Sequence, residues 1–535
     1  MTSSPAGAAS DGSQRLDWVV LLPSTVELPV DDALVLGGDD AFGSALVSGG
    51  VAESWHRPDG PSDRAMLVVV RADCPMDIEQ IARHVAPGGT LYMEVDRRRR
   101  GRHGRTPGAV GQILRRLGLR VFSTHIVAPD FERPRRYLPM EHRRALRWYL
   151  RTLFIPGSAP TRLGSRAVSL VLATPATPLV KAMAQRYIMI ATSRSDEAPA
   201  VGVPLARGGE RSIVLTSGYD SGSRALLLPF EPRAASPRFA VKIASSPGTA
   251  IGTIREHERL ISLHAILPPY IARGVPEPVG RYTLAARTAC VQSCAPGPLM
   301  NVLVGQWHRP VAESCRDLDV VVDWLSDFGC ATQVELSTVA SDWTSIYRHA
   351  AVVVEFPPDV VTLVADAERL ARSTRLGACA VHQHYDAAPW NVHLDGTRPV
   401  LIDWETDKLR PPDCLGPPLA DVLYLATYWY FLVARTRSHD AEEAALVRLF
   451  ATPNTKDPAV LCARSAIDRA AGRVGVEQRA VPAALVAMWL ERAVYTHRRR
   501  AALGESLGAA GSRPEAYLRA LAEVSPSLFE TWTNG

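Results

Sequence analysis

Short apolar runs alternate with helical patterns in the first 155 residues, and this alternation predicts an α/β layer structure. Four runs have the length and composition of buried strands, and one helical pattern lies between two of them. The predicted strands are residues 33–36, 66–70, 91–95 and 121–126, the predicted helix is 77–85, and residues 87–89 supply a turn. We therefore expect a Rossmann-like α/β domain at residues 16–155, after a disordered polar tail at residues 1–15.

A second pattern begins after a stretch rich in Ser, Pro, Gly and Thr, which predicts a linker at residues 156–200. Beyond it we expect three strands, one helix and, further on, a hairpin within a mostly helical region. The strands are residues 212–216, 224–229 and 239–243, the helix is 253–266, and the hairpin joins 391–394 to 400–404 through Asp395 and Gly396. This part of the chain therefore has an α+β pattern that becomes mostly helical after Val291.

Composition and charge narrow the classes of function. The 535 residues are too many for one ordinary domain, and a hydrophobic content of 47% is typical of packed cores. With 60 basic and 55 acidic side chains the formal net charge is only +5, so we predict no nucleic-acid partner. The eight cysteines lack zinc-like spacing and the first residues lack a secretion signal, so we expect a reduced, cytoplasmic protein. Asp421 interrupts the longest apolar stretch, residues 419–434, which predicts a buried helix and no membrane span.

Lysine is scarce, because the chain has only four: Lys181, Lys242, Lys408 and Lys456. Lys242 stands inside the apolar run FAVKI (239–243), where a charged side chain needs a partner. The helix that follows carries two acidic candidates, Glu256 and Glu258. Either of them would neutralise a buried lysine.

The most informative segment is HQHYDAAPWNV (382–392), which is followed across the predicted hairpin by LIDWE (401–405). A carboxylate such as that of Asp386 can orient an acceptor hydroxyl and take its proton. Asn391 and Asp403 lie at the foot of the two hairpin strands and offer the hard oxygen ligands that Mg²⁺ prefers. Alternatively, His384 and Asp386 only cap a turn and Asp403 only ends a strand. The combination of these residues at this spacing favours phosphoryl transfer.

These two segments resemble the aminoglycoside phosphotransferase and choline kinase family, whose catalytic loop reads H-x-D, four residues, then N, with a metal-binding I-D after the next hairpin. The resemblance implies a two-lobed kinase-like fold, with an N-lobe at residues 201–295 and a mostly helical C-lobe at residues 296–535. It implies ATP and Mg²⁺ as cofactors, with His384 and Asp386 in the catalytic loop and Asn391 and Asp403 as metal ligands. Tyr385 stands where the family usually has Gly and would crowd the acceptor site.

The same resemblance assigns phosphate contacts to the predicted N-lobe. Lys242 would pair with the α- and β-phosphates, and Glu256, through its spacing to the leucines at 260 and 263, would be the partner of Lys242, with Glu258 as the alternative. The loop 217–223 would cover the phosphates, because Gly218 and Gly222 let backbone amides approach anionic oxygens.

Further contacts follow from the resemblance at the junction of the lobes and after the hairpin. The backbone at Gln292, Ser293 and Cys294 would receive the adenine. Glu405 and Asp421 are secondary candidates, and for Asp421 we favour a carboxylate near a helix N-terminus that fixes the catalytic loop.

We expect the partner to be a small hydroxylated metabolite, held by the region after Thr406. Acidic and basic residues are nearly balanced there, so a polycationic aminoglycoside is not the favoured acceptor. The alternative function is that of a pseudokinase, a regulatory module that binds nucleotide without transferring phosphate. The sequence pattern selects no oligomeric state.

The N-terminal pattern partly resembles a class I methyltransferase that uses S-adenosylmethionine. The similar segments are ALVLGGDD (33–40), APGGTLYMEV (86–95) and LGLRVF (117–122). The G-x-G-x-G turn that lets the backbone approach the cofactor is missing, and no strand evidently ends in a ribose-binding acid. We therefore expect a degenerate domain with a structural role, and methyl transfer as the main activity is a third hypothesis.

Overall fold

The computed structural model describes residues 16–23, 25–98, 105–154, 184–193, 211–216, 224–244, 250–284, 287–306, 308–339, 342–404, 414–502, 504 and 512–533. The chain divides into two compact units. Unit 1 comprises Met1–His257 and Pro278–Cys294, and unit 2 comprises Glu258–Glu277 and Ala295–Gly535. The predicted tail 1–15, the loop 217–223 with Gly218 and Gly222, and Glu405 lie outside the described residues.

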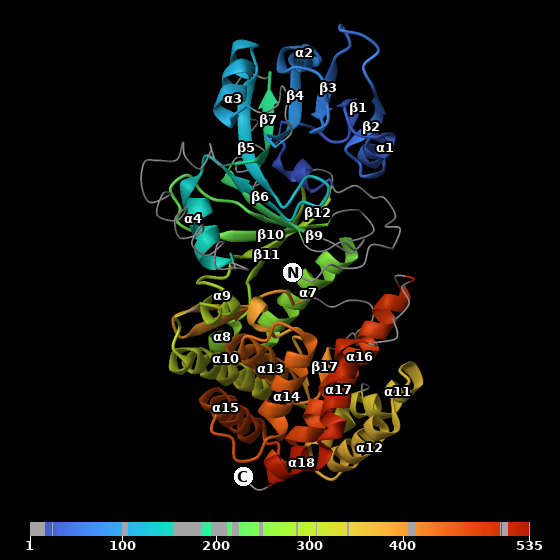
Figure 1. The fold of residues 1–535 in the computed structure, drawn as a ribbon, viewed down its shortest axis with the longest axis vertical. Coiled ribbons are helices and arrows are strands. Elements are labelled where there is room, and N and C mark those ends of the chain that lie inside the picture. The colour runs from blue at the N-terminus through green and yellow to red at the C-terminus, as the bar shows by residue number, and fades with distance from the viewer. Residues whose placement is uncertain are drawn as a thin grey trace. The chain divides into compact units, whose positions relative to one another are not determined.

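One mixed sheet organises unit 1 (Figure 1). In the described residues it has 12 strands in the order β11-β12-β10-β9-β8-β6-β5-β7-β4-β3-β1-β2. The strands are β1 (Val30–Leu36), β2 (Ala52–His56), β3 (Ala65–Val70), β4 (Val85–Asp96), β5 (Arg120–Ala128), β6 (Arg136–Pro139), β7 (Arg186–Thr192), β8 (Ile213–Thr216), β9 (Arg224–Leu228), β10 (Phe239–Ala244), β11 (Pro278–Leu284) and β12 (Arg287–Ser293). Because β6 pairs with β8, the sheet continues from the predicted α/β domain into the predicted N-lobe.

The part of the sheet nearest the N-terminus is parallel. Strands β2, β1, β3 and β4 pair in that order, and helices connect β1 to β2 and β3 to β4. The helices of this part are α1 (Asp40–Ser48), α2 (Ile78–Arg83), α3 (Pro107–Arg116) and α4 (Arg143–Thr152). The four predicted strands are confirmed, whereas β2 was not predicted, because its polar sequence AESWH belongs to a sheet edge that is partly exposed.

Strand β7 lies inside the segment that we expected to be a linker. It pairs antiparallel with β4 on one side and β5 on the other, and every residue after Arg186 is buried. The linker prediction is therefore wrong for residues 186–192. The predicted turn at 87–89 is instead part of β4, where Gly88 has a φ of 76° and the register with β3 shifts.

Strands β8 to β12 also pair antiparallel, and β8, β9 and β10 confirm the three strands predicted before residue 245. Lys242 is the one charged residue of β10, whose other residues are apolar. Alternate residues of the strand face opposite sides of the sheet. The predicted helix is α7 (Ala250–Ile266), which begins in unit 1 and ends in unit 2.

Unit 2 is mostly helical, as predicted (Figure 1). Its described helices are α8 (Pro269–Ala272), α9 (Met300–Val304), α10 (Val311–Thr332), α11 (Ile346–Val353), α12 (Pro358–Arg372), α13 (Ala420–Ala434), α14 (His439–Ala451), α15 (Pro458–Val474), α16 (Val481–Ala502), α17 (Arg513–Glu523) and α18 (Ser525–Thr533). Helix α13 confirms the predicted buried helix, with Trp429 and Tyr430 in the core. No helix in the described part of the chain combines the length and the apolar character that crossing a membrane requires.

Short strands in unit 2 carry the segment of chemical interest. Strand β14 (Cys379–His382) pairs with β13 (Val334–Glu335) and β17 (Leu415–Gly416). The predicted hairpin is formed by β15 (Val392–Asp395) and β16 (Arg398–Leu401), with Asp395 opposite Arg398 and Gly396 at a φ of 64°. The positive φ explains the glycine in this tight turn.

Candidate active site

Unit 1 brings Lys242 and Glu256 into contact. The Lys242 ammonium donates to both carboxylate oxygens of Glu256, at 2.6 and 2.8 Å. Arg224, at the start of β9, also donates to Glu256, at 2.8 Å, and was not predicted. Glu258, the alternative partner, is exposed. The partly buried lysine therefore has the partner that the helix spacing favoured.

Gln292, Ser293 and Cys294 lie at the end of β12. Gln292 pairs with Ala240 and Ser293 with Phe239 in the ladder to β10. The Cys294 amide donates to the Arg238 carbonyl at 2.9 Å, and burial raises the pKa of the Cys294 thiol to about 12. The ladder fixes this backbone, and its contact with adenine stays a prediction.

In unit 2, Asp421 holds residues 383–391, the segment predicted to be the catalytic loop, which follows β14. Its two carboxylate oxygens accept the backbone N–H groups of His384 at 2.6 Å and Tyr385 at 3.1 Å. Tyr385 has a φ of 66°, a conformation that glycine adopts without strain. Its buried ring and a hydrogen bond from its hydroxyl to the Leu415 carbonyl, at 3.2 Å, offset that strain. The Asp421 carboxylate therefore fixes the backbone of the loop at His384 and Tyr385.

His384 links the catalytic loop to the strand end that precedes Asp403. Its Nε2 lies 2.9 Å from the Ile402 carbonyl, and its Nδ1 lies 3.2 Å from the amide of Asp386. A carbonyl only accepts and an amide only donates, so Nε2 carries the proton and Nδ1 accepts. The Trp404 ring packs edge-on against the imidazole, with 4.5 Å between the centroids. His384 is therefore held in one tautomer with both nitrogens engaged.

Asn391 contacts Asp386 directly. Its amide nitrogen donates to the Asp386 carboxylate at 2.7 Å and to the Asp386 carbonyl at 3.0 Å, and neither bond uses the amide oxygen. Ile402 donates its N–H to the Asn391 carbonyl at 2.9 Å, which brings Asp403 to the same end of the hairpin. The carboxylate of Asp403 and the amide oxygen of Asn391 are ligands that suit Mg²⁺.

The environment of Asp386 raises the pKa of its carboxyl group. Partial burial is the main cause and the negative charge of Asp403 adds to it, while Arg492 and hydrogen bonds from Trp390 and Tyr424 act in the opposite direction. Repulsion between two neighbouring carboxylates is relieved by a cation, so the electrostatics also fit a metal ion.

Three residues around Asp386 were not predicted. Arg492 of α16 lies 3.9 Å from the Asp386 carboxylate, with its guanidinium 3.8 Å from the centroid of the Tyr424 ring. Trp390 donates to Asp386 at 3.4 Å, and Tyr424 shares a hydrogen bond with the same carboxylate. The only sequence signal was the position of Arg492 at the end of the apolar run VPAALVAMWL (481–490).

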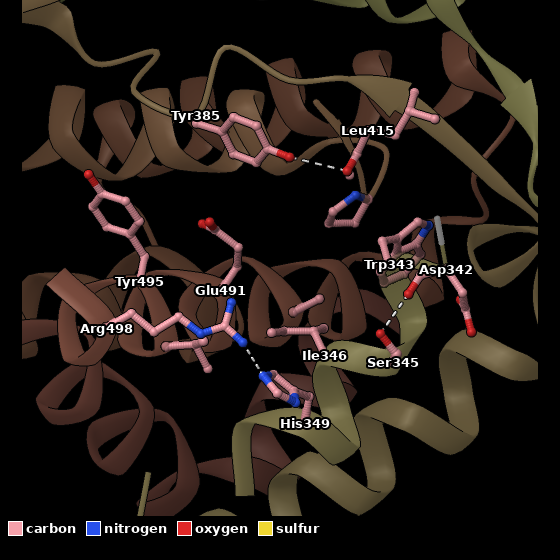
Figure 2. A pocket seen from close by; sticks show the side chains of 14 residues that line it. Asp342, Trp343, Ser345, Ile346, His349, Tyr385, Leu415, Glu491, Tyr495 and Arg498 are labelled. Carbon is pink, nitrogen blue, oxygen red and sulfur yellow. Dashed lines mark hydrogen bonds between the residues drawn. The ribbon is translucent and has the colours of Figure 1, made fainter. Parts of the chain in front are cut away.

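A cavity of about 390 Å³ lies beside the catalytic loop, with Tyr385 in its wall (Figure 2). Helix α16 contributes Glu491, Tyr495 and Arg498, and α11 contributes His349, whose ring is hydrogen-bonded to Arg498. Figure 2 shows the Glu491 side chain extending from α16 toward Tyr385. The cavity has the size of small-molecule sites in proteins.

The cavity and the Asp386–Arg492 ion pair are built from the same two segments of chain. Tyr385 lines the cavity and precedes Asp386, and Glu491 lines it and precedes Arg492. A molecule in the cavity would therefore lie next to the segments that hold the carboxylate of the catalytic loop.

The carboxyl ends of β1 and β3 form the switch point of the parallel strands, where open α/β sheets bind ligands. Gly37 and Gly38 have φ values of 77° and 71° there. Asp73 accepts the N–H of Gly38 at 2.9 Å, and Arg57 donates to the Gly38 carbonyl at 2.9 Å. A Cβ on Gly37 would lie 2.8 Å from an Asp73 oxygen. Side chains of the protein itself therefore engage the polar groups of this turn.

No family model matches the sequence, and no curated protein matches it. Among solved structures the chain is similar to an aminoglycoside phosphotransferase of Alicyclobacillus acidocaldarius, with a TM-score of 0.33 and 13% identity, over 64% of this chain and 97% of that one. A Ralstonia eutropha protein described as an aminoglycoside phosphotransferase has a TM-score of 0.37 and 14% identity, and the match covers 60% of this chain and 92% of that one. The chain is also similar to APH(3'')-Id of Streptomyces rimosus, solved with ADP and streptomycin. The TM-score is 0.28 and the identity 13%, and the match covers 56% of this chain and 90% of that one. These similar structures are those of aminoglycoside phosphotransferase-type kinases.

Proposed function

We propose that the chain is an ATP-dependent phosphotransferase that transfers the γ-phosphate of ATP to a hydroxyl group of a small molecule. The observation that carries this proposal is the arrangement of Asp386, Asn391 and Asp403 on one loop and hairpin. A carboxylate that only caps a turn is satisfied by backbone N–H groups. Asp386 is instead held by side chains, and its own side chain stays 39% exposed, within reach of an acceptor.

Each residue has a distinct role in the proposed reaction. Asp386 orients the acceptor hydroxyl and takes its proton. Asn391, through its amide oxygen, and Asp403 would hold Mg²⁺, which neutralises charge on the phosphate oxygens. Lys242, oriented by Glu256, would bind the α- and β-phosphates. His384 has both ring nitrogens engaged by the backbone of Ile402 and Asp386, so it is a positioning residue.

We place the acceptor in the cavity beside Tyr385. Its volume of about 390 Å³ suits one metabolite-sized molecule. Its lining mixes aromatic and apolar side chains with the carboxylates of Asp342 and Glu491, and Arg498 adds a positive charge that offsets one of them. This mixture favours a hydroxylated metabolite over a polycation.

For the parallel part of the sheet we propose a structural role. Arg57 and Asp73 already engage the turn at Gly38, which is the place where a nucleotide-like cofactor would need free backbone groups. Calorimetric titration with S-adenosylmethionine should therefore give no binding heat. A saturable signal would refute the structural role.

The main test is transfer of radiolabelled γ-phosphate from ATP to a library of hydroxylated metabolites. We expect Asp386→Asn to lower turnover by about 10²- to 10⁴-fold, the usual contribution of a positioned proton acceptor. Asp403→Asn should abolish turnover, and the melting temperatures of both variants should equal that of the wild-type protein. Asp395→Asn is the matched control, because Asp395 is an exposed carboxylate on the same hairpin.

Two outcomes would contradict the proposal in different ways. Unchanged turnover in Asp386→Asn would show that this carboxylate is not the proton acceptor. Binding of MgATP without transfer to any member of the library would identify a pseudokinase.

A further inference from the structure

Trp390 is an exposed neighbour of the Asp386 carboxylate. Within the described part of the chain that carboxylate meets the side chains of Asn391, Tyr424, Arg492 and Trp390. Asn391 and Tyr424 are buried, and the Arg492 side chain is 13% exposed, whereas Trp390 is 36% exposed. A molecule that reaches Asp386 from the solvent therefore passes beside the indole of Trp390.

Two contacts hold the indole of Trp390 in one orientation. Its Nε1–H donates to the Asp386 carboxylate at 3.4 Å, and its ring meets the ring of Tyr428 edge-on, with 4.9 Å between the centroids. Tyr428, on α13, packs in the same way against Tyr424, with 4.8 Å between the centroids. Aromatic pairs in this geometry attract each other. An aromatic ring that is already oriented loses little conformational freedom when a ligand stacks on it.

The part of the acceptor that reacts must lie outside the cavity beside Tyr385, because Asp386 is not among the residues that line that cavity. In the proposed reaction a hydroxyl of the acceptor lies within hydrogen-bond distance of the Asp386 carboxylate. The indole nitrogen lies 3.4 Å from the same carboxylate. The portion of the acceptor that carries the reacting hydroxyl therefore touches Trp390.

The surroundings of Trp390 favour a neutral ring as this portion of the acceptor. The face of an indole carries partial negative charge, which attracts C–H groups and cations. The guanidinium of Arg492 already lies 3.8 Å from the centroid of the neighbouring Tyr424 ring, and its charge repels a second cation. A saturated ring with C–H groups on its face and hydroxyl groups at its rim can stack on the indole and still reach Asp386. An open-chain polyol has no such face.

We propose that Trp390 binds the acceptor, and that the acceptor is a neutral sugar or cyclitol whose ring stacks on the indole while one of its hydroxyl groups reaches Asp386. The inference rests on the proposed function, in which Asp386 takes the proton of the acceptor hydroxyl. It narrows the substrate class from hydroxylated metabolites in general to those with a saturated, uncharged ring.

The competing explanation is that Trp390 only orients Asp386 through its Nε1–H. The two roles predict different kinetic effects. A residue that binds the ring of the acceptor changes KM, and it does so for ring compounds alone. A residue that only orients the carboxylate changes kcat for every acceptor alike and leaves KM unchanged.

The test is to measure kcat and KM of the full-length protein for hexopyranosides and cyclitols, and for open-chain hexitols, at saturating MgATP. The wild-type protein should use the ring compounds with the lower KM. For Trp390→Ala we expect KM for ring compounds to rise about three- to tenfold, the value of one aromatic contact, and KM for hexitols to change less than about twofold.

Trp390→Phe separates stacking from hydrogen bonding. Phenylalanine keeps an aromatic face and lacks the Nε1–H, so KM for ring compounds should stay within about twofold of the wild-type value while kcat falls. Tyr270→Ala is the matched control, because Tyr270 is an exposed aromatic residue of α8. It should leave both constants unchanged.

The outcomes separate the inference from the function beneath it. If the wild-type protein transfers phosphate to no acceptor, the proposed function fails and the inference fails with it. If it transfers phosphate and Trp390→Ala keeps the wild-type KM for ring compounds, the inference alone is overturned. A preference for open-chain or cationic acceptors over neutral rings also overturns it. Should Trp390→Ala not fold, Trp390→Leu, which keeps apolar bulk without an aromatic face, must still raise KM for ring compounds.

Discussion

The amide nitrogen of Asn391 donates to the carboxylate of Asp386 across 2.7 Å, while the amide oxygen takes no part in that bond. One side chain therefore orients the proposed proton acceptor with one atom and offers an oxygen ligand with the other. This division of tasks requires an amide, because a carboxylate at position 391 has no N–H to donate.

We predict that Asn391→Asp lowers turnover by about 10²-fold even though it keeps an oxygen ligand. The substitution removes the donor and places two carboxylates in contact, which misorients Asp386. Initial rates at saturating ATP and acceptor measure the effect. Asn454→Asp, at an exposed asparagine, is the control. Wild-type rates in Asn391→Asp would show that the amide donor is dispensable.

Replacing Asp421 with Asn should loosen the catalytic loop. The amide keeps one acceptor and turns an N–H donor toward a backbone N–H, so one of the two amides of His384 and Tyr385 is left unsatisfied. We expect the free energy of unfolding to fall by about 1–3 kcal/mol and turnover to fall with it. Urea unfolding measures the first effect. Asp440→Asn, in the first turn of α14 and exposed, should leave both unchanged.

Arg492 should matter for turnover although it lies far from Asp386 in the sequence. Arg492→Met keeps the apolar stem and removes the positive charge beside Asp386 and the cation over the Tyr424 ring. We expect turnover to fall roughly tenfold or more, with partial recovery in Arg492→Lys. Arg499→Met, at an exposed position of α16, is the comparison. Equal rates in Arg492→Met and wild type would remove Arg492 from the site.

Glu94 should make stability depend on pH. It is buried in unit 1, and burial raises the pKa of its carboxyl group to about 7, against the opposing effects of Arg71, the Ala72 amide and Tyr92. Between about pH 4.5 and 7 the folded state keeps a proton that the unfolded state releases, so stability falls as pH rises through this window.

Glu94→Gln should remove this part of the pH dependence. Urea unfolding between about pH 5 and about pH 8 measures the slope. Glu53→Gln, at an exposed position of β2, should keep the wild-type slope. An unchanged slope in Glu94→Gln would assign the effect to another group.

Features that depend on neighbouring residues could be predicted from the sequence. The hairpin around Gly396 and the buried strand with Lys242 follow from local turn chemistry and apolar runs. Lys242 and Glu256 could be paired because a strand and the next helix are neighbours in space. The loop with Asp386 was found because its residue types and spacing are set by one short piece of chain.

Features that depend on tertiary packing could not be predicted. Arg492 reaches Asp386 only because α16 packs against α13, and no local pattern encodes that contact. Strand β7 has an apolar sequence, but its place between β4 and β5 depends on strands far away in the chain. The sequence placed Arg224 at the start of a strand and gave its charge no role, because its contact with Glu256 forms only in the folded chain.

The pairing of β6 with β8 has a practical consequence for anyone who shortens this protein. Tyr137 lies opposite Val214, and Arg136 lies opposite Leu215. A fragment that starts at residue 211 would begin with a strand whose outer N–H and C=O groups lack their partner, and such a strand readily recruits another chain and aggregates. Expression trials with residues 211–535 alone should therefore yield insoluble material unless residues of β5, β6 and β7 are kept with them.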